Sequence, residues 1–418
     1  MKNNSLDDII YEKVSFQIRQ YFKKITLQID KVETGILLHK LKDCGIGGKV
    51  GCWLAAFLDS GARQQAVVVD GRVSPLSPVV SGVPQGTVLG PVLFLIHISD
   101  IGNGLSERTT ASSFADDTRV KRGIQTVEDC SALQSDMQVI YSWARDVNMH
   151  FNGDKFECMR LWPKPSNAPD FDYLGPNGEV IEVKPSLKDL GVHLSSDLSF
   201  KLQVEKTVSA SSKLAGWGLR TFRRRSLGTM KTIWKSLIQP KLDYCSQFWS
   251  PGDQESINRL ESVQRHFLSQ VTGEVSSSMG YWDRLKEFKV YSQERRRERY
   301  MVIFLWKVSQ GMVHGYNVDF TSVCGRRGRT ALPRDVVQSS SSLVRKAREA
   351  SIGVKGAKIF NLLPASVRNM DVENVDMFKK ELDSFLSQVP DQPTVAGYGR
   401  SAETNSLLHQ LPLFLINN

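Results

Sequence analysis

The sequence predicts an α+β fold that becomes all helical in its second half. Short strand-like segments and amphipathic helices alternate irregularly up to about residue 199, and only helical periodicity follows. A length of 418 residues indicates two or three domains, and 41% hydrophobic with 23% charged residues is ordinary globular composition. This composition excludes a disordered, a collagen-like or a membrane-bundle protein.

The elements of the first half follow from local patterns. Residues 36–58 have the apolar spacing of helices, and Asp70-Gly71 is a turn between two short strands. A loop rich in glycine, proline and small residues, 74–90, leads into an apolar helix at 92–101. Residues 114–120 then predict a strand, a turn and a strand, with two carboxylates at the tip.

A second helix and further strands complete this part. Thr126 and Asp129 predict a capping-box start, and Asn152-Gly153 ends the helix. Three more strand-like segments follow, at 156–162, 180–183 and 190–194.

The second half shows repeated helical stripes. Pro240 stops the first, and the tail from residue 390 is expected to be loose apart from an apolar end at 411–416. The stripes cover residues 227–238, 257–271, 300–307 and 372–385.

The net charge of +10 is unevenly distributed. Residues 201–350 contain 27 Lys and Arg against 13 Asp and Glu, an excess of 14 positive charges, which leaves −4 for the rest. A basic part beside a slightly acidic part is typical of nucleic-acid enzymes, in which metal-binding carboxylates and phosphate contacts lie apart. A solvated basic face without a partner explains the charge equally well.

Targeting signals are lacking in the sequence. The longest apolar run, 91–98, is far shorter than the roughly 20 residues that a membrane span needs, and we identify no signal peptide. Six scattered cysteines without a CxxC pair indicate reduced thiols. We expect an intracellular protein, nuclear or cytoplasmic, that is not secreted and has no membrane partner.

Three features could carry chemistry. Asp116 and Asp117 at a hairpin tip can coordinate Mg²⁺, although paired aspartates also cap turns. The loop from Ser81 to Gly86 lets backbone approach a ligand, but a plain loop entering a helix has the same composition. Lys155 could neutralise a phosphate or protonate a leaving pyrophosphate, or be a surface lysine on an edge strand.

Together these features resemble the palm of a reverse transcriptase. The order S-G-V-P-Q-G-x-x-L-G-P, F-A-D-D and N-x-x-K-F is most similar to the enzymes of non-LTR retrotransposons of the LINE type, in the jockey and CR1 group. The similarity extends from about residue 30 to at least residue 386. It includes K-D-L-G-V at 188–192, D-Y-C at 243–245, W-S-P at 249–251, Y-S-Q-E-R-R-R-E-R-Y at 291–300 and F-N-L-L-P at 360–364.

The resemblance implies a right-hand polymerase palm, an antiparallel sheet with packed helices, followed by an all-helical thumb and C-terminal region. It implies nucleotidyl transfer to a primer 3′-hydroxyl with two Mg²⁺ or Mn²⁺ ions, an RNA template, a DNA primer and deoxynucleoside triphosphates. Asp116 and Asp117 match the metal-binding carboxylates, and Lys155 matches the lysine that assists pyrophosphate departure.

Further binding residues follow from the same resemblance. The loop that touches template and incoming nucleotide corresponds to Gly82, Pro84, Gln85 and Gly86. We interpret the run Arg295, Arg296 and Arg297 as phosphate contacts in the basic thumb-like helices.

One position departs from the family pattern. The family stretch L-D-F-S-K-A-F-D aligns so that its last Asp is Asp30, and its first, catalytic Asp falls on Lys24. A lysine brings positive charge to the place where cations should bind, so we expect impaired nucleotidyl transfer. The alternative is a non-catalytic, basic nucleic-acid-binding remnant of such an element.

The resemblance also suggests domain boundaries. Residues 1–24 are unlike the family, 25–199 would be a palm whose fingers are largely missing, and 200–320 a basic thumb-like region. Residues 321–418 would be C-terminal helices and a loose tail. We therefore expect an N-terminally truncated element without an endonuclease.

Overall fold

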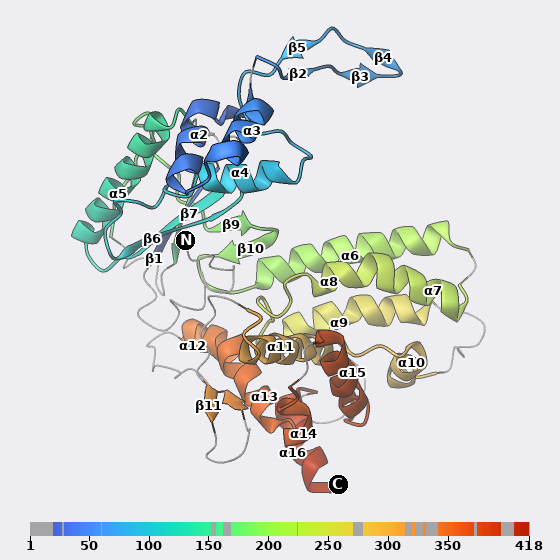
Figure 1. The fold of residues 1–418 in the computed structure, drawn as a ribbon. Helices are drawn as coiled ribbons and strands as arrows, with labels where there is room; N and C mark the ends of the chain where they lie inside the picture. The colour runs from blue at the N-terminus through green and yellow to red at the C-terminus, as the bar shows by residue number, and fades with distance from the viewer. Residues whose placement is uncertain are drawn as a thin grey trace. The chain divides into compact units, whose positions relative to one another are not determined.

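The computed structural model forms two compact units, which divide between Pro185 and Ser186 (Figure 1). It describes residues 20–26, 29–59, 61–149, 151, 156–161, 169–223, 225–270, 279–313, 320–322, 329–331, 342–371, 374–393 and 405–417.

A four-stranded antiparallel sheet forms the centre of the first unit. The strand order is β6-β7-β1-β8, so the first strand in the sequence lies in the interior of the sheet. The strands are β1 (Gln20–Thr26), β6 (Thr109–Phe114), β7 (Asp117–Gly123) and β8 (Glu157–Leu161). The predicted strand at 180–183 is wrong, because this segment forms only the isolated bridges of Val180 and Val183.

Helices pack with this sheet around one hydrophobic core. The core joins Val120 and Cys158 of the sheet to Leu93, Met137 and Ile140 of the helices. The helices are α2 (Thr34–Asp43), α3 (Gly48–Leu58), α4 (Leu89–His97) and α5 (Val127–Asp146), and the short helix η1 (Ile29–Lys31) follows β1. The capping box predicted for α5 is confirmed: Thr126 and Asp129 bond reciprocally.

A narrow ribbon projects from the helices of this unit (Figure 1). Its tip is the predicted turn, with positive φ at Asp70 (50°) and Gly71 (77°). The ribbon consists of β2 (Gln64–Gln65), β3 (Val68–Val69), β4 (Arg72–Val73) and β5 (Ser77–Pro78), whose side chains are all exposed.

The second unit is mostly helical. It begins with a hairpin, β9 (Ser186–Asp189) and β10 (Val192–Ser195), before the long helix α6 (Lys201–Thr221). The middle elements are α7 (Leu227–Ile233), the π-helix η4 (Trp234–Ile238), α8 (Gln239–Asp243), α9 (Gln254–Ser269), α10 (Tyr281–Phe288) and α11 (Gln293–Ser309).

The last part differs from the predicted loose tail. Asn405, Leu407 and Leu411 are buried, so the segment before and within α16 packs against the unit. A short hairpin also interrupts the expected helices. The elements are β11 (Phe320–Ser322), β12 (Arg329–Ala331), α12 (Ser342–Glu349), η5 (Ile352–Gly356), α13 (Ala357–Leu362), α14 (Ala365–Arg368), α15 (Val375–Leu386) and α16 (Leu407–Asn417).

None of the helices in the described ranges is long and apolar enough to cross a membrane.

Candidate functional site

The hairpin of β6 and β7 presents the predicted carboxylates. Phe114 pairs with Asp117, so Ala115 and Asp116 form a two-residue turn. Ala115 has φ of 49°, a left-handed conformation that is costly for a residue with a Cβ and is characteristic of strained functional turns. Asp116 and Asp117 are both half-buried at this tip.

The neighbouring strand β1 brings position 24 close to this tip. In the antiparallel register Thr26 pairs with Asp117, and Lys24 pairs with Arg119 on one side and Glu157 on the other. Position 24 is therefore diagonal to Asp117 on the same face, a relationship with a typical Cα separation of about 7–8 Å. The backbone register thus places position 24 near the Asp116-Asp117 tip.

The acidic residues next in the sequence do not supply a carboxylate there. Glu33 is the N-cap of α2, and its carboxylate accepts hydrogen bonds from the N–H groups of Gly35 (3.1 Å) and Ile36 (2.9 Å). Asp30 is exposed in η1. Within the described ranges no three His, Cys, Asp or Glu residues are grouped to hold a metal ion. The residues present, two carboxylates and a lysine position, do not fit a two-ion centre.

The predicted binding loop is fixed to the segment that follows β1. The N–H of Gly82 donates to the carbonyl of Val32 (2.8 Å), and Ser81 Oγ donates to the carbonyl of Asp30 (2.8 Å). Gly82 has φ of 81°, and an added Cβ would lie 3.0 Å from the Cα of Asp30. Glycine is required here because the two backbone segments approach so closely.

The second half of the loop forms a tight turn before α4. Thr87 Oγ1 donates to the carbonyl of Pro84 (2.8 Å) and accepts from the N–H of Gly90 (3.0 Å). A Cβ on Gly90 would overlap the Pro84 oxygen. Gln85 and Gly86 are exposed at the turn. The structure thus brings the predicted loop residues together and presents Gln85 to solvent.

Lys155, the third predicted feature, lies outside the described residues. Its role in assisting pyrophosphate departure stays a prediction.

Sequence reasoning missed a polar network that holds β7 to α5. Asp136 accepts from Ser106 Oγ (2.7 Å) and from Thr109, and Arg122 Nη1 lies 3.4 Å from its carboxylate. Arg122 also approaches Asp129 (3.8 Å). Thr109 on β6 and Arg122 on β7 are buried although their strands are polar in sequence, and their partners on α5 reveal their role.

A second network joins α2, α4 and α5. Lys40 Nζ donates to the carbonyl of His97 (2.6 Å) and to Asp100 (2.6 Å), which also accepts from Trp143 Nε1 (2.9 Å). Burial and the nearby Lys40 ammonium lower the pKa of His97 to about 4. His97 is therefore neutral near pH 7 and has a packing role.

In the second unit, Tyr244 fixes the turn of the β9–β10 hairpin. Leu190 (φ 42°) and Gly191 (φ 84°) form the turn. Tyr244 Oη donates to the carbonyl of Leu190 (2.7 Å), and a Cβ on Gly191 would lie 3.1 Å from the Tyr244 ring. Leu190 and Gly191 of the K-D-L-G-V motif are therefore in contact with Tyr244 of the D-Y-C motif.

The predicted phosphate contacts at Arg295, Arg296 and Arg297 are not supported by their surroundings. Arg295 is fully buried (0% exposed) and donates to the carbonyls of Val389 (3.3 Å) and Pro390 (2.7 Å). Arg297 is 3% exposed and lies over the Trp249 ring at 3.9 Å. These two side chains stabilise the interior and are not presented to a phosphate.

Arg296 also pairs within the protein. Its guanidinium forms a bidentate pair with Asp243 through Nε (2.8 Å) and Nη2 (2.7 Å). Further along α11, Arg299 pairs in the same way with Asp383 (2.5 and 2.6 Å). The helix α11 is therefore a buried polar centre of the second unit.

Buried acids accompany these arginines. Glu261 accepts from Tyr281 Oη and from the N–H of Gln293 (2.7 Å), and burial raises its pKa to about 8. Glu298 pairs with Lys355 (2.8 Å), and burial together with Glu298 raises the pKa of Glu294 to about 7.

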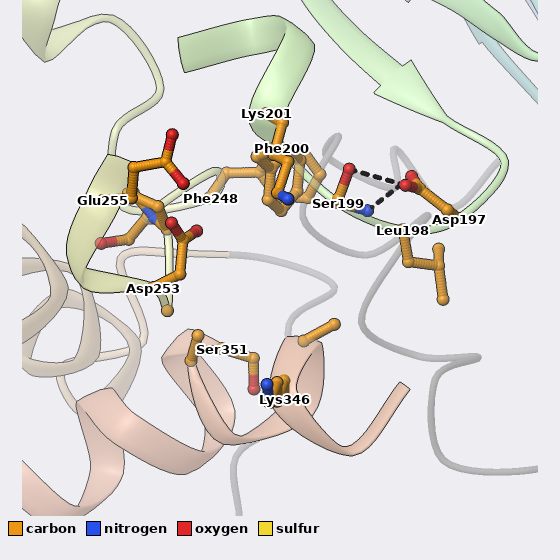
Figure 2. Close-up of a pocket in the computed structure, with 15 residues that line it drawn as sticks. Asp197, Leu198, Ser199, Phe200, Lys201, Phe248, Asp253, Glu255, Lys346 and Ser351 are labelled. Atoms are coloured by element: carbon orange, nitrogen blue, oxygen red, sulfur yellow. Dashed lines mark hydrogen bonds between the residues drawn. The ribbon is translucent and has the colours of Figure 1, made fainter. Parts of the chain in front are cut away.

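A cavity of about 340 Å³ lies in the same unit (Figure 2). Phe200 and Phe248 form its aromatic wall, with ring centroids 5.5 Å apart. Asp197 accepts from the N–H and Oγ of Ser199 (both 2.9 Å), and Asp253 caps α9 through the N–H of Ser256 (2.9 Å). The carboxylates of Asp197 and Asp253 are therefore engaged in a local turn and a helix cap.

Comparison with known proteins identifies the first part of the chain. Residues 28–193 match the family model described as reverse transcriptase (RNA-dependent DNA polymerase). The matched range contains the loop at 81–86, the Asp116-Asp117 tip and the turn of the β9–β10 hairpin, and it begins after Lys24.

Curated relatives agree with this family. The RNA-directed DNA polymerase from mobile element jockey of Drosophila melanogaster is 28% identical over 217 residues, half of this chain and 23% of that relative. The jockey polymerase of Drosophila funebris is 27% identical, over 50% of this chain and 24% of that relative. The probable RNA-directed DNA polymerase of transposon X-element from Drosophila melanogaster is 28% identical, with coverages of 50% and 24%.

The match spans about a quarter of the length of these relatives. Residues 28–193 match the reverse transcriptase family model, and the chain is similar to the RNA-directed DNA polymerases of these mobile elements.

Proposed function

We propose that this chain is the reverse transcriptase portion of a non-LTR retrotransposon, and that its own nucleotidyl transfer is impaired. The observation that carries the proposal is the register of β1, in which Lys24 takes the position diagonal to Asp117. A lysine there opposes the binding of cations instead of supporting it. We derive no catalytic step through a metal ion, since the residues present do not fit a two-ion centre.

We assign substrate binding to elements of the first unit. In this proposal the first unit is the palm, with Gln85 and Gly86 exposed to touch template and incoming deoxynucleotide. The loop is rigid because Gly82 bonds to Val32 and Thr87 to Pro84, so little ordering cost accompanies binding.

The second unit supplies a thumb-like phosphate-binding face. Lys201, Lys206 and Lys213 are exposed along α6, in contrast to the buried arginines of α11. Contacts of lysines with phosphates are independent of sequence, and they weaken as the salt concentration rises because the counterions that binding releases then gain less entropy. We therefore assign the grip on RNA template and DNA primer to α6 in place of Arg295 to Arg297.

A second candidate function follows from the same observation. A chain that keeps the binding elements and lacks the acidic cluster would be a nucleic-acid-binding remnant without catalysis. Lys24 favours the non-catalytic function for this chain. Asp116, Asp117 and Gln85 favour its descent from a polymerase.

The two functions are distinguished by paired assays on the full chain. Fluorescence anisotropy with an RNA template annealed to a DNA primer measures binding over a salt series, and primer extension with Mg²⁺ or Mn²⁺ measures catalysis. We expect salt-sensitive binding and extension no greater than that of Asp116→Ala. Absence of binding would contradict both functions, and extension that Asp116→Ala abolishes would contradict the impairment.

A further inference from the structure

A further cleft of about 740 Å³ lies in the second unit and includes Tyr244 and the Asp243–Arg296 pair. It lies where η4, α8 and the segment after α8 meet α11. Its lining residues are Lys235, Gln239, Pro240, Asp243, Tyr244, Gln247, Arg296 and Tyr300. The volume is in the range of small-molecule and cofactor pockets.

Two tyrosine rings line this cleft in fixed positions. Tyr244 keeps 51% of its surface exposed although its hydroxyl is held by the Leu190 carbonyl at 2.7 Å. Tyr300 accepts from Arg296 Nη2 (2.8 Å), and the guanidinium groups of Arg296 and Arg299 lie 5.2 and 5.9 Å from its ring centroid, so this ring is already used within the protein. Rings that are already ordered lose little conformational entropy when a planar ligand stacks on them.

The charge of the cleft suits an anion. Asp243 is the one acidic side chain of the lining, and its bidentate pair with Arg296 neutralises it. Lys235 therefore gives the cleft a positive charge.

The backbone around the cleft is irregular in two places. The π-helix η4 precedes Pro240, and π-turns are frequent at functional sites. Cys245, directly after Tyr244, has φ of 51°, a conformation that costs free energy for a residue with a side chain. Both distortions present residues of the cleft: Lys235 on η4, and Tyr244 and Gln247 beyond α8.

We propose that this cleft binds a single-stranded nucleic-acid segment, with a base stacked on Tyr244, a phosphate at Lys235 and a base edge at Gln247. Unpaired bases expose the faces and edges that such a surface needs, whereas a duplex hides them. The inference deepens the proposed function and rests on it, since Tyr244 also holds the β9–β10 turn of the matched domain.

The test measures anisotropy of the full chain with fluorescein-labelled oligouridylate of roughly 12 nucleotides. Lys235→Ala should weaken binding several-fold and reduce the slope of log affinity against log salt by about one. Lys241→Ala is the matched control, because Lys241 is exposed on α8 and does not line the cleft. Equal effects of the two substitutions would overturn the assignment.

Tyr244 tests stacking separately. Tyr244→Phe keeps the ring and should bind within about threefold of the native chain, while Tyr244→Leu should lose about tenfold. If Tyr244→Leu fails to fold, Gln247→Ala takes its place, with an expected loss of severalfold. Unchanged binding by the ring-less variant, or by Gln247→Ala in its place, would overturn the proposal.

A comparison of duplex binding with single-strand binding shows whether the cleft proposal or the proposed function fails. Cleft substitutions that leave single-strand binding intact, in a chain that still binds template and primer, contradict the cleft alone. If the native chain binds neither single-stranded nor duplex nucleic acid, the proposed function is contradicted. Equal weakening of single-strand and duplex binding by Lys235→Ala would show a general basic surface and overturn the single-strand assignment.

Discussion

Lys24 and Asp117 occupy diagonal positions on the paired strands β1 and β7, because Lys24 is opposite Arg119 and Asp117 is opposite Thr26. The relationship depends on backbone register, so it holds for whichever side chain occupies position 24. A substitution at position 24 can therefore change the charge near the Asp116-Asp117 tip without changing the pairing of the strands.

The tight turn before α4 predicts a large cost for Gly90→Ala. The added methyl would overlap the carbonyl oxygen of Pro84, which already accepts from Thr87, so the loop must shift. We expect a loss of about 1–3 kcal/mol in the free energy of unfolding, measured by urea denaturation. Gly228→Ala in α7 is the control, since its Cβ meets nothing and alanine favours helices. Equal stability of the two variants would contradict this packing.

Gln85, which is exposed in the loop, predicts a change in binding without a change in stability. Gln85→Ala should leave the free energy of unfolding unchanged and weaken template–primer binding, because Gln85 is exposed at the turn. Loss of a single hydrogen bond is worth about 0.5–1.5 kcal/mol, so the expected decrease in affinity is about threefold to tenfold. Gln138→Ala, exposed on α5, is the matched control. Unaltered binding by Gln85→Ala would show that the loop does not touch the template.

The buried arginine run predicts a stability defect without a change in electrostatic binding. Arg295→Met should lower the free energy of unfolding by about 2 kcal/mol, because the carbonyls of Val389 and Pro390 lose their donor. The salt dependence of RNA binding should stay the same. Lys206→Ala, exposed on α6, should show the reverse pattern. A reduced salt slope for Arg295→Met would restore the phosphate-contact interpretation.

Glu261 predicts that part of the stability falls as pH rises. Burial raises the pKa of this acid from its ordinary value of 4.5 to about 8, so the folded chain holds a proton that the unfolded chain releases. The folded state is therefore disfavoured progressively between pH 4.5 and about 8, by about 1.4 kcal/mol for each unit of pH. Glu261→Gln should flatten the pH profile of urea denaturation in this window. An unchanged slope would show that Glu261 is ionised in the folded chain.

Local patterns could be predicted from the sequence. The Asp70-Gly71 turn and the Thr126–Asp129 capping box are confirmed, because turns and caps depend on residues close in sequence. The placement of Asp116 at a hairpin tip depends likewise on the adjacent pairing of Phe114 with Asp117.

Tertiary partners could not be predicted. Charged runs on helices are typical of solvated faces. Arg296 nevertheless forms an ion pair with Asp243, which is 53 residues away in the sequence. Buried Asn405 in the expected loose tail depends in the same way on Ser292 and Asp391. Whether a polar side chain is buried follows from such distant partners, which a single sequence does not display.

The central claim is tested most directly by restoring a carboxylate at position 24 and measuring primer extension on an RNA template with Mg²⁺. The native chain should extend no more than Asp116→Ala, and Lys24→Asp should gain extension that is lost again in the double variant with Asp116→Ala. Lys23→Asp, the adjacent position on the other face of β1, should remain inactive. Extension by the native chain that requires Asp116, or continued silence of Lys24→Asp, would contradict the account.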